Sequence, residues 1–438
     1  MSGRPRILHL HSTFAAGGKE TRDVRLMNQW GDALEHVIVS AVPDRLEAAG
    51  QIAPGVPWRI AQDAPPLAGR PSPARLKALA AWMRAERFDL ALSFNWGALD
   101  GAMAARWLAG LPVVHHEDGF NEDERDRQKP ARRLMRRLLL PRMSAVVVPS
   151  LALERLARAT WGLAPPRLVR IPNGIDVEAL AIAPAADAIP GLERRPGELV
   201  VGTLAGLRRI KNLPRLVRAF AAATTDADTP PARLVIVGDG AEAGAIRAEA
   251  ARLGVADRLL MPGFLPDPHR YVGLFDIFAL SSDSEQFPIS LVEAMAAGRP
   301  AVAPAVGDVA DIVSAANRPW IVAPGDEAAL AAALGAALRD APARAAVGAA
   351  NSMVIKITQV GTVSEALEAC RLATAHGYNV HPCGSRGDTD SIADFSVAVN
   401  AGQVRAVDAN RMLSIEQELG SAAVWPGLSG LKGVRNQA

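Results

Sequence analysis

The sequence predicts an α/β protein with two doubly wound domains, each a parallel sheet covered by helices on both faces, and a smaller α/β segment after them. Short apolar runs alternate with longer Ala-, Leu- and Arg-rich stretches, and this βαβα alternation is typical of a parallel sheet. The alternation stops at residues 187–196, which are rich in Pro, Gly and charge, and then starts again. The length of 438 residues also suits two or three domains, at ~150 residues each.

The strands of both domains are predicted from buried, β-type runs. In the first domain the runs are Arg6–His11, His36–Val42, Leu90–Phe94, Leu111–His115 and Ala145–Pro149. In the second domain they are Glu198–Thr203, Arg233–Gly238, Leu259–Met261, Ile277–Ser281 and Pro300–Ala303. We therefore expect domains at 1–185, 186–350 and 351–438. The first two should form a cleft for a nucleotide-like ligand at the carboxyl ends of their strands.

Composition excludes several classes of protein. The 48 basic and 46 acidic residues nearly cancel, so no global charge attracts nucleic acid. Cys370 and Cys383 are too few for a disulfide scaffold or a four-cysteine zinc site, and two thiols fit a reducing compartment. The N-terminal apolar stretch is interrupted by His9 and His11, and no uncharged run approaches the ~18 residues of a membrane span. We expect a cytoplasmic protein.

Glycines and cationic side chains follow predicted strands at three places. Gly17 and Gly18 precede a helix, so their amides can approach an anion, although ordinary turns use such pairs equally often. His116 can donate to a phosphate or to an acceptor hydroxyl, with a satisfied turn histidine as the alternative. Lys211 ends a glycine-bearing loop and can neutralise a diphosphate leaving group without a metal, with a plain surface lysine as the alternative.

Two carboxylates, Glu285 and Glu293, stand eight positions apart across a loop and the start of a predicted helix. At that spacing one carboxylate can reach sugar hydroxyls and the other a ribose diol. The alternative is that both glutamates are solvated and merely flank the start of a helix. The surrounding sequence decides between a sugar-binding role and this alternative.

That surrounding sequence resembles a known family. Asp283–Pro300 resembles the EX7E nucleotide-sugar signature of retaining glycosyltransferases with the two-Rossmann GT-B fold, as in glycosyltransferase family 4. Ile171–Asp176 (IPNGID) matches the hinge element of that family, Val237–Gly240 (VGDG) matches a strand end, and Gly307 falls in the following glycine loop. The similarity covers about residues 5 to 350 in the order of the family. It implies a nucleotide-sugar donor, a sugar, glycan or lipid-linked acceptor, retention of configuration, and a role in polysaccharide or glycolipid assembly.

The resemblance also implies roles for individual residues. Glu285 would contact hydroxyls of the donor sugar and His116 would sit beside the transferring sugar, so these two are the catalytic candidates. Glu293 would bind the ribose and Lys211 the diphosphate. The other positions implied in donor binding are Gly17, Gly18 and Arg208, with the backbone of Phe287, Pro288, Ile289, Ser290 and Leu291.

One position departs from the pattern of the family. An arginine is common five residues before the phosphate-binding lysine, and this chain has Gly206 there. Either Arg208 or Arg209 replaces the missing charge, or diphosphate binding is weakened. Enzymes of this fold need no divalent ion, so we expect no metal and no other cofactor. Asp226–Asp228 and Asp388–Asp390 have Asp-x-Asp spacing, but neither follows a strand of the site.

Segment 129–142 is predicted to be a basic amphipathic helix with Leu134, Met135 and Leu138 opposite its cations. The basic residues at helical spacing are Lys129, Arg132, Arg133, Arg136 and Arg137. Such a helix can lie on anionic lipid at the inner face of a membrane. A helix packed on its own domain, with a solvated basic face, is the alternative.

The sequence changes character after residue 350. Met353–Thr362 looks like the sixth barrel strand of enolase, and Lys356 aligns with the general base of that family. The family's Ser-His-Arg-Ser stretch is replaced by Cys383–Arg386, and its second active-site lysine position carries Arg405. The metal-binding carboxylates and five preceding barrel strands are absent, and a barrel cannot close from its last units. We infer a truncated glycosyltransferase joined to an enolase-like tail, by gene rearrangement or in cloning.

Three functions are therefore weighed. The first is a nucleotide-sugar-dependent glycosyltransferase of the hexosyltransferase type, on the collective motifs. The second is an inactive fusion relic or a nucleotide-binding scaffold, motivated by Gly206 and by the lack of a final crossover helix. The third is an enolase-type hydro-lyase, which rests on Lys356 alone.

Overall fold

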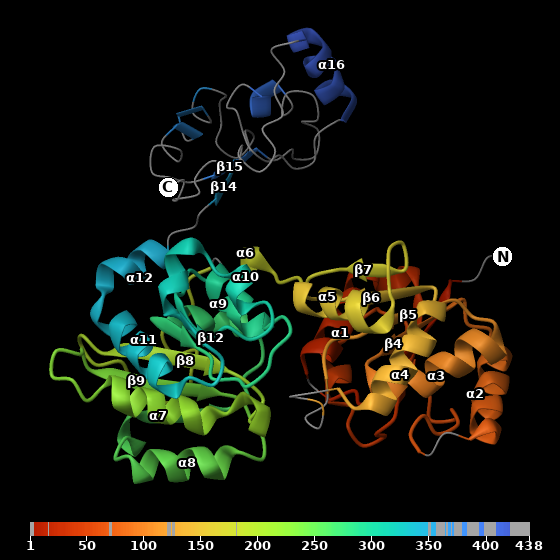
Figure 1. Cartoon of the computed structure of the whole chain (residues 1–438), viewed down its shortest axis with the longest axis horizontal. Helices are drawn as coiled ribbons and strands as arrows, with labels where there is room; N and C mark the ends of the chain where they lie inside the picture. Colours follow the sequence, from red (N-terminus) through yellow and green to blue (C-terminus); the bar gives the residue numbers. More distant parts are fainter. Residues whose placement is uncertain are drawn as a thin grey trace. The chain divides into compact units, whose positions relative to one another are not determined.

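The computed structural model describes most of the chain up to residue 348 and short stretches beyond. The described residues are 4–15, 17–69, 72–120, 124, 128–180, 182–348, 352–355, 364, 367–368, 370–371, 379–382, 394–397 and 409–420. The chain divides into two compact units, one of residues 1–312 with 319–340 and one of residues 313–318 with 341–438. The first unit holds both doubly wound sheets (Figure 1). The domain boundaries at 185/186 and 350/351 stay predictions.

The first sheet, as far as the structure describes it, has seven parallel strands in the order β3-β2-β1-β4-β5-β6-β7. The strands are β1 (Arg6–His11), β2 (Glu35–Ser40), β3 (Trp58–Ile60), β4 (Leu90–Phe94), β5 (Val113–His116), β6 (Ala145–Val148) and β7 (Leu168–Arg170). β1 lies between β2 and β4, and His9 pairs with Ile38 on one side and Leu92 on the other. This reversal of order at the first strand defines a doubly wound sheet of Rossmann type.

The second sheet repeats the same order with six described strands, β10-β9-β8-β11-β12-β13. The strands are β8 (Leu199–Leu204), β9 (Ala232–Val237), β10 (Leu259–Gly263), β11 (Ile277–Ala279), β12 (Ala301–Pro304) and β13 (Ile321–Val322). Gly202 of β8 pairs with Val235 of β9 and with Phe278 of β11. The predicted fold class is therefore confirmed for both sheets.

Helices connect the strands and cover both faces of each sheet (Figure 1). Those following the first set of strands are α1 (Gly18–Trp30), α2 (Pro73–Glu86), α3 (Leu99–Met103), α4 (Pro130–Leu139), α5 (Leu151–Trp161) and α6 (Val177–Leu180). Those of the second set are α7 (Leu213–Ala223), α8 (Ala243–Arg252), α9 (Ile289–Ala296), α10 (Val309–Ile312) and α11 (Glu327–Arg339), followed by α12 (Ala341–Gly348) in the other unit. The starting positions of three helices follow from N-capping: the side chain of Ser72 accepts a backbone N–H of α2, that of Ser150 one of α5, and that of Asp326 one of α11.

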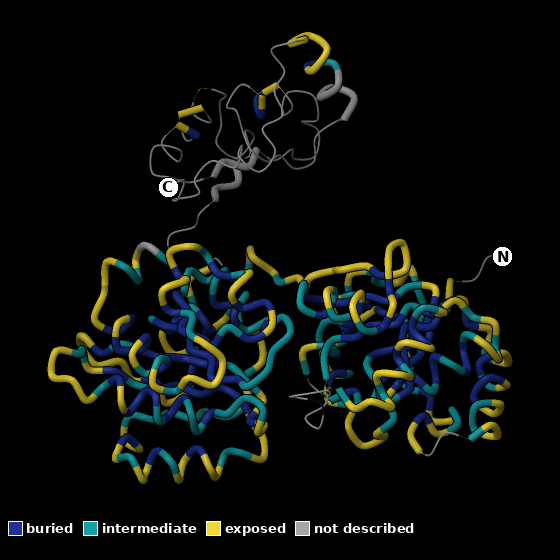
Figure 2. The backbone as a smooth tube through the Cα atoms, viewed as in Figure 1, coloured by how far each residue is buried: buried dark blue, intermediate teal, exposed yellow. Residues whose placement is uncertain are grey.

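The sheets form the buried core. Leu8, Leu10, Val37 and Val146 are buried between the first sheet and its helices, and Figure 2 shows buried backbone running through the centre of each sheet. Because helices cover both faces of each sheet, the central strands are continuous apolar runs in the sequence, and these runs correctly predicted their positions. The strands that sequence reasoning missed are β3, β7 and β13, which have only two or three residues each.

Two described strands and one long helix lie in the C-terminal segment. β14 (Ser352–Ile355) pairs in parallel with β15 (Asn379–Pro382), and α16 spans Ala409–Leu419. A parallel pair is what two neighbouring barrel strands would form, and no closed barrel occurs within the described stretches. Lys356, Cys383–Arg386 and Arg405 lie outside the described residues.

Across the described part of the chain, no helix is both long and apolar enough to cross a membrane.

Gly202 permits close packing at the centre of the second sheet, and replacing it should destabilise the fold. A Cβ atom at this position would lie 2.2 Å from ring carbons of the fully buried Phe275. We expect Gly202→Ala to lower the free energy of unfolding by about 1–3 kcal/mol, as overpacking does. Urea denaturation of the full chain measures the change.

The matched control is Gly244→Ala in α8, where an added Cβ meets nothing within 4 Å. Alanine in an open helix position should stabilise by about 0.5–1 kcal/mol. Equal effects of the two substitutions would contradict the packing of β8 against Phe275.

Candidate active site

Both sheets place loops at the point where their strand order reverses, the usual ligand site of such folds. In the first sheet the chain leaves β1 through Gly17 and Gly18 into α1, and it leaves β5 at His116. In the second sheet it leaves β8 toward Lys211, and it leaves β11 toward Glu285. The sequence-predicted site residues therefore lie at the carboxyl ends of strands in both domains.

Lys211 and Glu285 form an ion pair in the second domain. Lys211 Nζ lies 2.5 Å from Glu285 Oε1, and the Ser282 hydroxyl donates to the same oxygen over 2.7 Å. The Ser281 hydroxyl donates to the Lys211 carbonyl over 2.9 Å, which ties the two loops together. Both charged side chains are mostly buried, so the pair presents a cation and a carboxylate to one small volume.

Glycines allow the loops of this site to approach one another. Gly307 has φ +57°, and a Cβ there would lie 2.4 Å from the Glu285 carbonyl oxygen. Gly238 has φ +142°, and a Cβ there would lie 1.9 Å from the Ala205 carbonyl oxygen. Only glycine fits both positions, which explains why the VGDG element and the later glycine loop accompany the charged residues.

The N-terminus of α9 lies beside this pair in the sequence. Pro288 is its N-cap, so the amides of Ile289 and Ser290 precede the first intrahelical hydrogen bond. Leu291 is buried and anchors the helix, whereas Phe287 is half-buried. Such a terminus offers N–H groups and the positive end of a helix dipole to an anion.

Arg208 lies where it can compensate for Gly206. Its side chain is exposed, and its Nε lies 3.6 Å from the position of a Cβ on Gly206. The guanidinium of Arg208 therefore passes close to the space that a longer side chain at position 206 would enter.

Glu293 is buried one turn into α9, and α1 of the first domain supplies its partner. Arg25 NH2 lies 3.5 Å from Glu293 Oε1. Burial raises the pKa of the Glu293 carboxyl above its usual range, although the Arg25 charge partly opposes this effect. The pair joins the two domains, as does the Asp308 carboxylate, which accepts from the backbone N–H groups of Leu151 and Ala152 over 2.6 and 2.9 Å.

Gly17 and Gly18 open α1 next to the second domain. Gly17 is the N-cap of α1 in an extended conformation, and a Cβ on Gly18 would lie 3.5 Å from Ile289 Cδ1. Lys19 pairs with the buried Glu20 in the same turn. The structure thus brings the glycine pair to the start of α9, the helix that carries Glu293.

His116 is buried at the end of β5. Its ring stacks on Phe94 with centroids 4.8 Å apart, and its Nδ1 lies 3.3 Å from a guanidinium nitrogen of Arg22. Burial and the Arg22 charge lower the pKa of His116 to about 3. The ring is therefore neutral at physiological pH.

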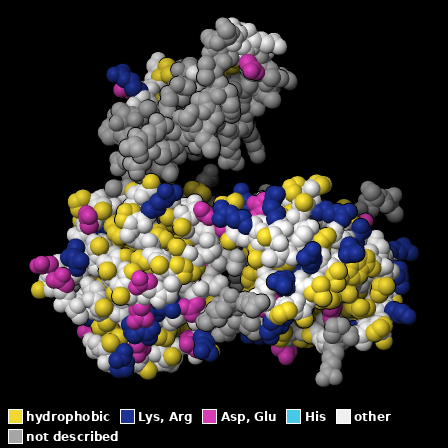
Figure 3. All heavy atoms as spheres, viewed as in Figure 1, with side chains coloured by type: hydrophobic (Ala, Val, Ile, Leu, Met, Phe, Trp, Pro, Cys, Tyr) yellow, Lys and Arg dark blue, Asp and Glu magenta, His cyan; other side chains and the backbone are white. Residues whose placement is uncertain are grey.

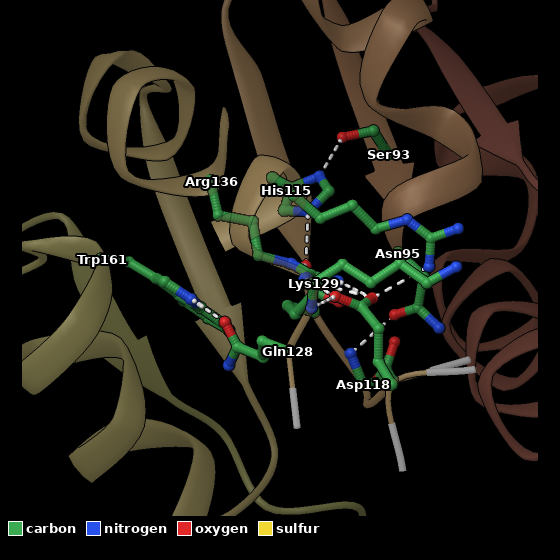
Figure 4. A network of polar contacts seen from close by, with 11 residues as sticks. Ser93, Asn95, His115, Asp118, Gln128, Lys129, Arg136 and Trp161 are labelled. Carbon is green, nitrogen blue, oxygen red and sulfur yellow. Dashed lines mark hydrogen bonds and ion pairs between the residues drawn. The ribbon is translucent and has the colours of Figure 1, made fainter. Parts of the chain in front are cut away.

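A buried ion network joins Arg136 of α4 to the residues at and after the end of β5 (Figure 4). Arg136 donates to Glu117 Oε2 over 3.2 Å and to Glu124 Oε1 over 3.1 Å. Its guanidinium also lies 5.1–5.6 Å from the ring centroids of Trp96, Phe120 and Trp161.

This network corrects the predicted amphipathic helix. Arg136 is 1% exposed and belongs to the buried face of α4, because two glutamates and three aromatic rings receive its charge. Leu134 and Leu138, expected opposite the cations, are instead exposed beside Arg133 and Arg137. The partner Glu124 lies outside α4, so the helical periodicity of α4 gave no signal of the pairing.

Sequence reasoning also missed a buried polar cluster on β1 and α1. His9, His11 and Asp23 are fully buried, and Asp23 Oδ2 lies 2.8 Å from a ring nitrogen of each histidine. Their ligand-type atoms lie within 4.8 Å of one another, as a metal site would need. The 2.8 Å separations are hydrogen-bond lengths, and His36 Nδ1 bonds the far side of His9 over 2.9 Å. The sequence signal that could have indicated this cluster was the placement of His9 and His11 on the same side of one predicted strand.

Comparisons with known proteins agree with this geometry. Residues 16–179 match the family described as Glycosyltransferase Family 4, and residues 187–352 match Glycosyl transferases group 1. Among solved structures, Anabaena HepE in complex with UDP and glucose is similar at a TM-score of 0.64 and 23% identity, over 78% of this chain and 92% of that chain. A glycosyltransferase from Rickettsia africae ESF-5 reaches 0.61 at 12% identity, over 80% and 92% of the two chains. At these identities the likeness concerns the fold.

The sheet topology and the two family matches give these two domains the GT-B architecture of glycosyltransferases. Residues 16–352 carry the two domains of such an enzyme, family 4 in the first and group 1 in the second.

A second family occupies the C-terminal segment. Residues 338–434 match the family described as Enolase, C-terminal TIM barrel domain. The enolase of Bifidobacterium animalis subsp. lactis is 43% identical over 101 residues, which is 20% of this chain and 23% of that enolase. The chain thus spans less than a quarter of the length of this relative. The predicted enolase-like fragment is confirmed.

Arg136 should be the most costly charged side chain of α4 to remove. Arg136→Met leaves Glu117 buried without its guanidinium partner and leaves Glu124 with Arg132 as its remaining cation, so we expect the free energy of unfolding to fall by about 3–5 kcal/mol. Arg137→Met, one position along and exposed, should change it by at most about 0.5 kcal/mol. Chemical denaturation of the two variants compares them directly. Similar losses in both would show that the network does not hold this region.

Proposed function

We propose that the chain transfers a sugar from a nucleoside-diphosphate sugar to a sugar, glycan or lipid-linked acceptor, with retention of configuration, in polysaccharide or glycolipid assembly. The observation that carries the proposal is the Lys211–Glu285 pair at the carboxyl end of the second sheet, next in sequence to the start of α9. HepE was solved with UDP and glucose, which supports a uridine diphosphate donor here.

The diphosphate is the leaving group, and this chain's cations would stabilise it. As the bond between the sugar carbon and the phosphate oxygen breaks, negative charge grows on that oxygen. The acceptor hydroxyl oxygen forms the new bond to the sugar carbon, and its proton passes to the departing diphosphate. Lys211 and the amides of Ile289 and Ser290 would neutralise that charge, with Arg208 in place of the arginine missing at Gly206. These groups supply positive charge from the protein itself, so the proposal includes no metal ion or other cofactor.

Donor binding would exchange ion pairs rather than create new charge. Lys211 would shift from Glu285 to the diphosphate, which frees the Glu285 carboxylate to accept from sugar hydroxyls while Ser282 holds its orientation. Glu293 would accept from the ribose diol in place of Arg25. The empty site thus keeps both carboxylates neutralised until the donor arrives.

The proposed donor site predicts a selective thermal shift. A ligand at ~100 times its dissociation constant adds about 2.7 kcal/mol to the native state. We expect one of UDP, GDP or ADP, or its sugar conjugate, to raise the melting temperature of the full chain. Glu293→Gln should abolish the shift without lowering the ligand-free melting temperature, because the amide removes a carboxylate whose ionised form burial disfavours.

The outcomes separate the candidate functions. Loss of the shift in both Glu293→Gln and Lys211→Met, with transfer or donor hydrolysis in the unchanged chain, supports the enzyme. Selective binding without transfer or hydrolysis indicates a nucleotide-binding scaffold. If all nucleotides raised the melting temperature equally, and both variants kept this shift, the result would contradict the proposed site.

An exposed surface on the first domain fits a lipid-linked acceptor. We define the α4 face as Arg133, Leu134, Arg137 and Leu138. Leu134 and Leu138 are 55% and 46% exposed, and Figure 3 shows a hydrophobic area bordered by Lys and Arg on this domain. A groove of about 290 Å³ between α4 and α5 is lined by both arginines and Leu134.

The α4 face is proposed to contact anionic membrane. Two arginines near a charged lipid surface add about 1 kcal/mol each, so Arg133→Gln with Arg137→Gln should weaken vesicle binding roughly thirtyfold. Sedimentation with phosphatidylglycerol vesicles measures this, with phosphatidylcholine vesicles as the uncharged reference.

A matched control substitutes exposed apolar residues elsewhere. Ile182 and Phe264 are 69% and 55% exposed and lie outside the α4 face, so Ile182→Ser with Phe264→Ser should leave vesicle binding unchanged. Leu134→Ser with Leu138→Ser, on the α4 face, should weaken vesicle binding. Binding that is equal for both vesicle types would contradict the proposed contact.

A further inference from the structure

Arg22 of α1 contacts three side chains from two other segments of the chain, the end of β5 with the residues just after it and the segment after β7. Its NH2 lies 2.9 Å from Asp118 Oδ2 and 3.3 Å from His116 Nδ1, and its NH1 donates to Asn173 Oδ1 over 2.9 Å. The Arg22 and Asp118 side chains are only 14% and 12% exposed, so water competes weakly for these bonds. The guanidinium is therefore fixed from two sides before it meets the histidine.

The chemistry of the guanidinium determines the proton on His116. Arginine has five N–H donors and no acceptor, so His116 Nδ1 must be the acceptor in this contact. A neutral imidazole carries one proton, which then resides on Nε2. Within the described part of the chain, no hydrogen bond occupies His116 Nε2, while Phe94 stacks on the face of the ring.

Burial, followed by the Arg22 charge, keeps the His116 ring in this neutral form. The charged or titratable groups acting on His116 are Arg22, Asp23, His115 and His11, from α1, β5 and β1. Arg22 opposes protonation of the ring, whereas the Asp23 charge favours it and is shared with His9 and His11. Asp118 faces Arg22, and Asn95 fixes the Asp118 backbone through a 2.7 Å hydrogen bond.

We propose that Arg22 is a positioning residue that fixes the Nε2–H tautomer of His116, so that His116 serves as a hydrogen-bond donor to a sugar oxygen and not as a proton acceptor. The part concerning the sugar rests on the proposed transferase function. The part concerning the tautomer rests only on the contacts of Arg22. Specificity follows from it, because the group facing Nε2 must be an acceptor such as a hydroxyl oxygen.

Nitrogen NMR of the histidine rings tests the tautomer without any ligand. The full chain, labelled with ¹⁵N, has eight histidines, and the His116→Gln variant assigns the signal. In the unchanged protein we expect the Nε2–H pattern and no titration of His116 between pH 5 and 8. Arg22→Met should mix the tautomers and raise the pKa of His116 toward the ordinary ~6.5.

Two further variants separate tautomer control from general structural damage. Arg22→Lys keeps a donor-only cation and should retain the Nε2–H pattern, whereas Arg25→Met, one turn along α1, should leave the His116 signal unchanged. An Nδ1–H pattern in the unchanged protein would overturn the inference even if Arg22→Met fails to fold. An unaltered His116 signal in a folded Arg22→Met variant would also overturn it.

Failure of the inference and failure of the proposed function are distinguishable. The tautomer is measured without donor, so a wrong tautomer leaves the thermal-shift result for the nucleotides untouched. If transfer is observed, Arg22→Met should begin to lose activity at a higher pH than the unchanged protein as the pH falls, because without the Arg22 charge the imidazole takes up a proton more readily.

Discussion

The pairing of the first strand of each sheet with two neighbours is the constraint on which the site depends. β1 bonds to β2 and β4, and β8 bonds to β9 and β11, so the connections after these strands leave in opposite directions. A gap opens between such connections, and polar loops can enter it without interrupting the hydrogen bonds of the sheet. Lys211 and Glu285 stand on two loops of this kind. Their proximity follows from topology, although they are far apart in the sequence.

Charge balance then decides which residues the loops can carry. Three carboxylates near the site have a cation beside them: Glu285 has Lys211, Glu293 has Arg25 and Asp118 has Arg22. A buried unpaired charge costs several kcal/mol, so these pairs make a polar site compatible with a stable fold. The same pairs explain how an anionic ligand could enter, because it would take over a cation that is already fixed in place.

Sequence reasoning succeeded where structure depends on local or motif-like patterns. Apolar runs located the central strands, because burial on both faces leaves no polar alternation. It failed for edge strands such as β7, whose Val169 and Arg170 are exposed. Arg136 was misplaced on a solvated face, because its burial depends on Glu117 and Glu124, which lie outside α4 and do not share its periodicity. The role of Arg22 was equally invisible, since its partners come from segments brought together only by the fold.

The start of α5 gives the two domains a shared dependence. Ser150 caps the amide of Leu153, but the amides of Leu151 and Ala152 are satisfied by Asp308, which belongs to the other sheet's domain. Apart from a substitution to proline, no side-chain change in α5 removes either amide, so Asp308 controls this helix start from the other domain. Separated from its neighbour, the first domain would expose these two N–H groups and its α5 would begin to fray. The second domain therefore completes the secondary structure of the first, and the fully capped α5 requires both.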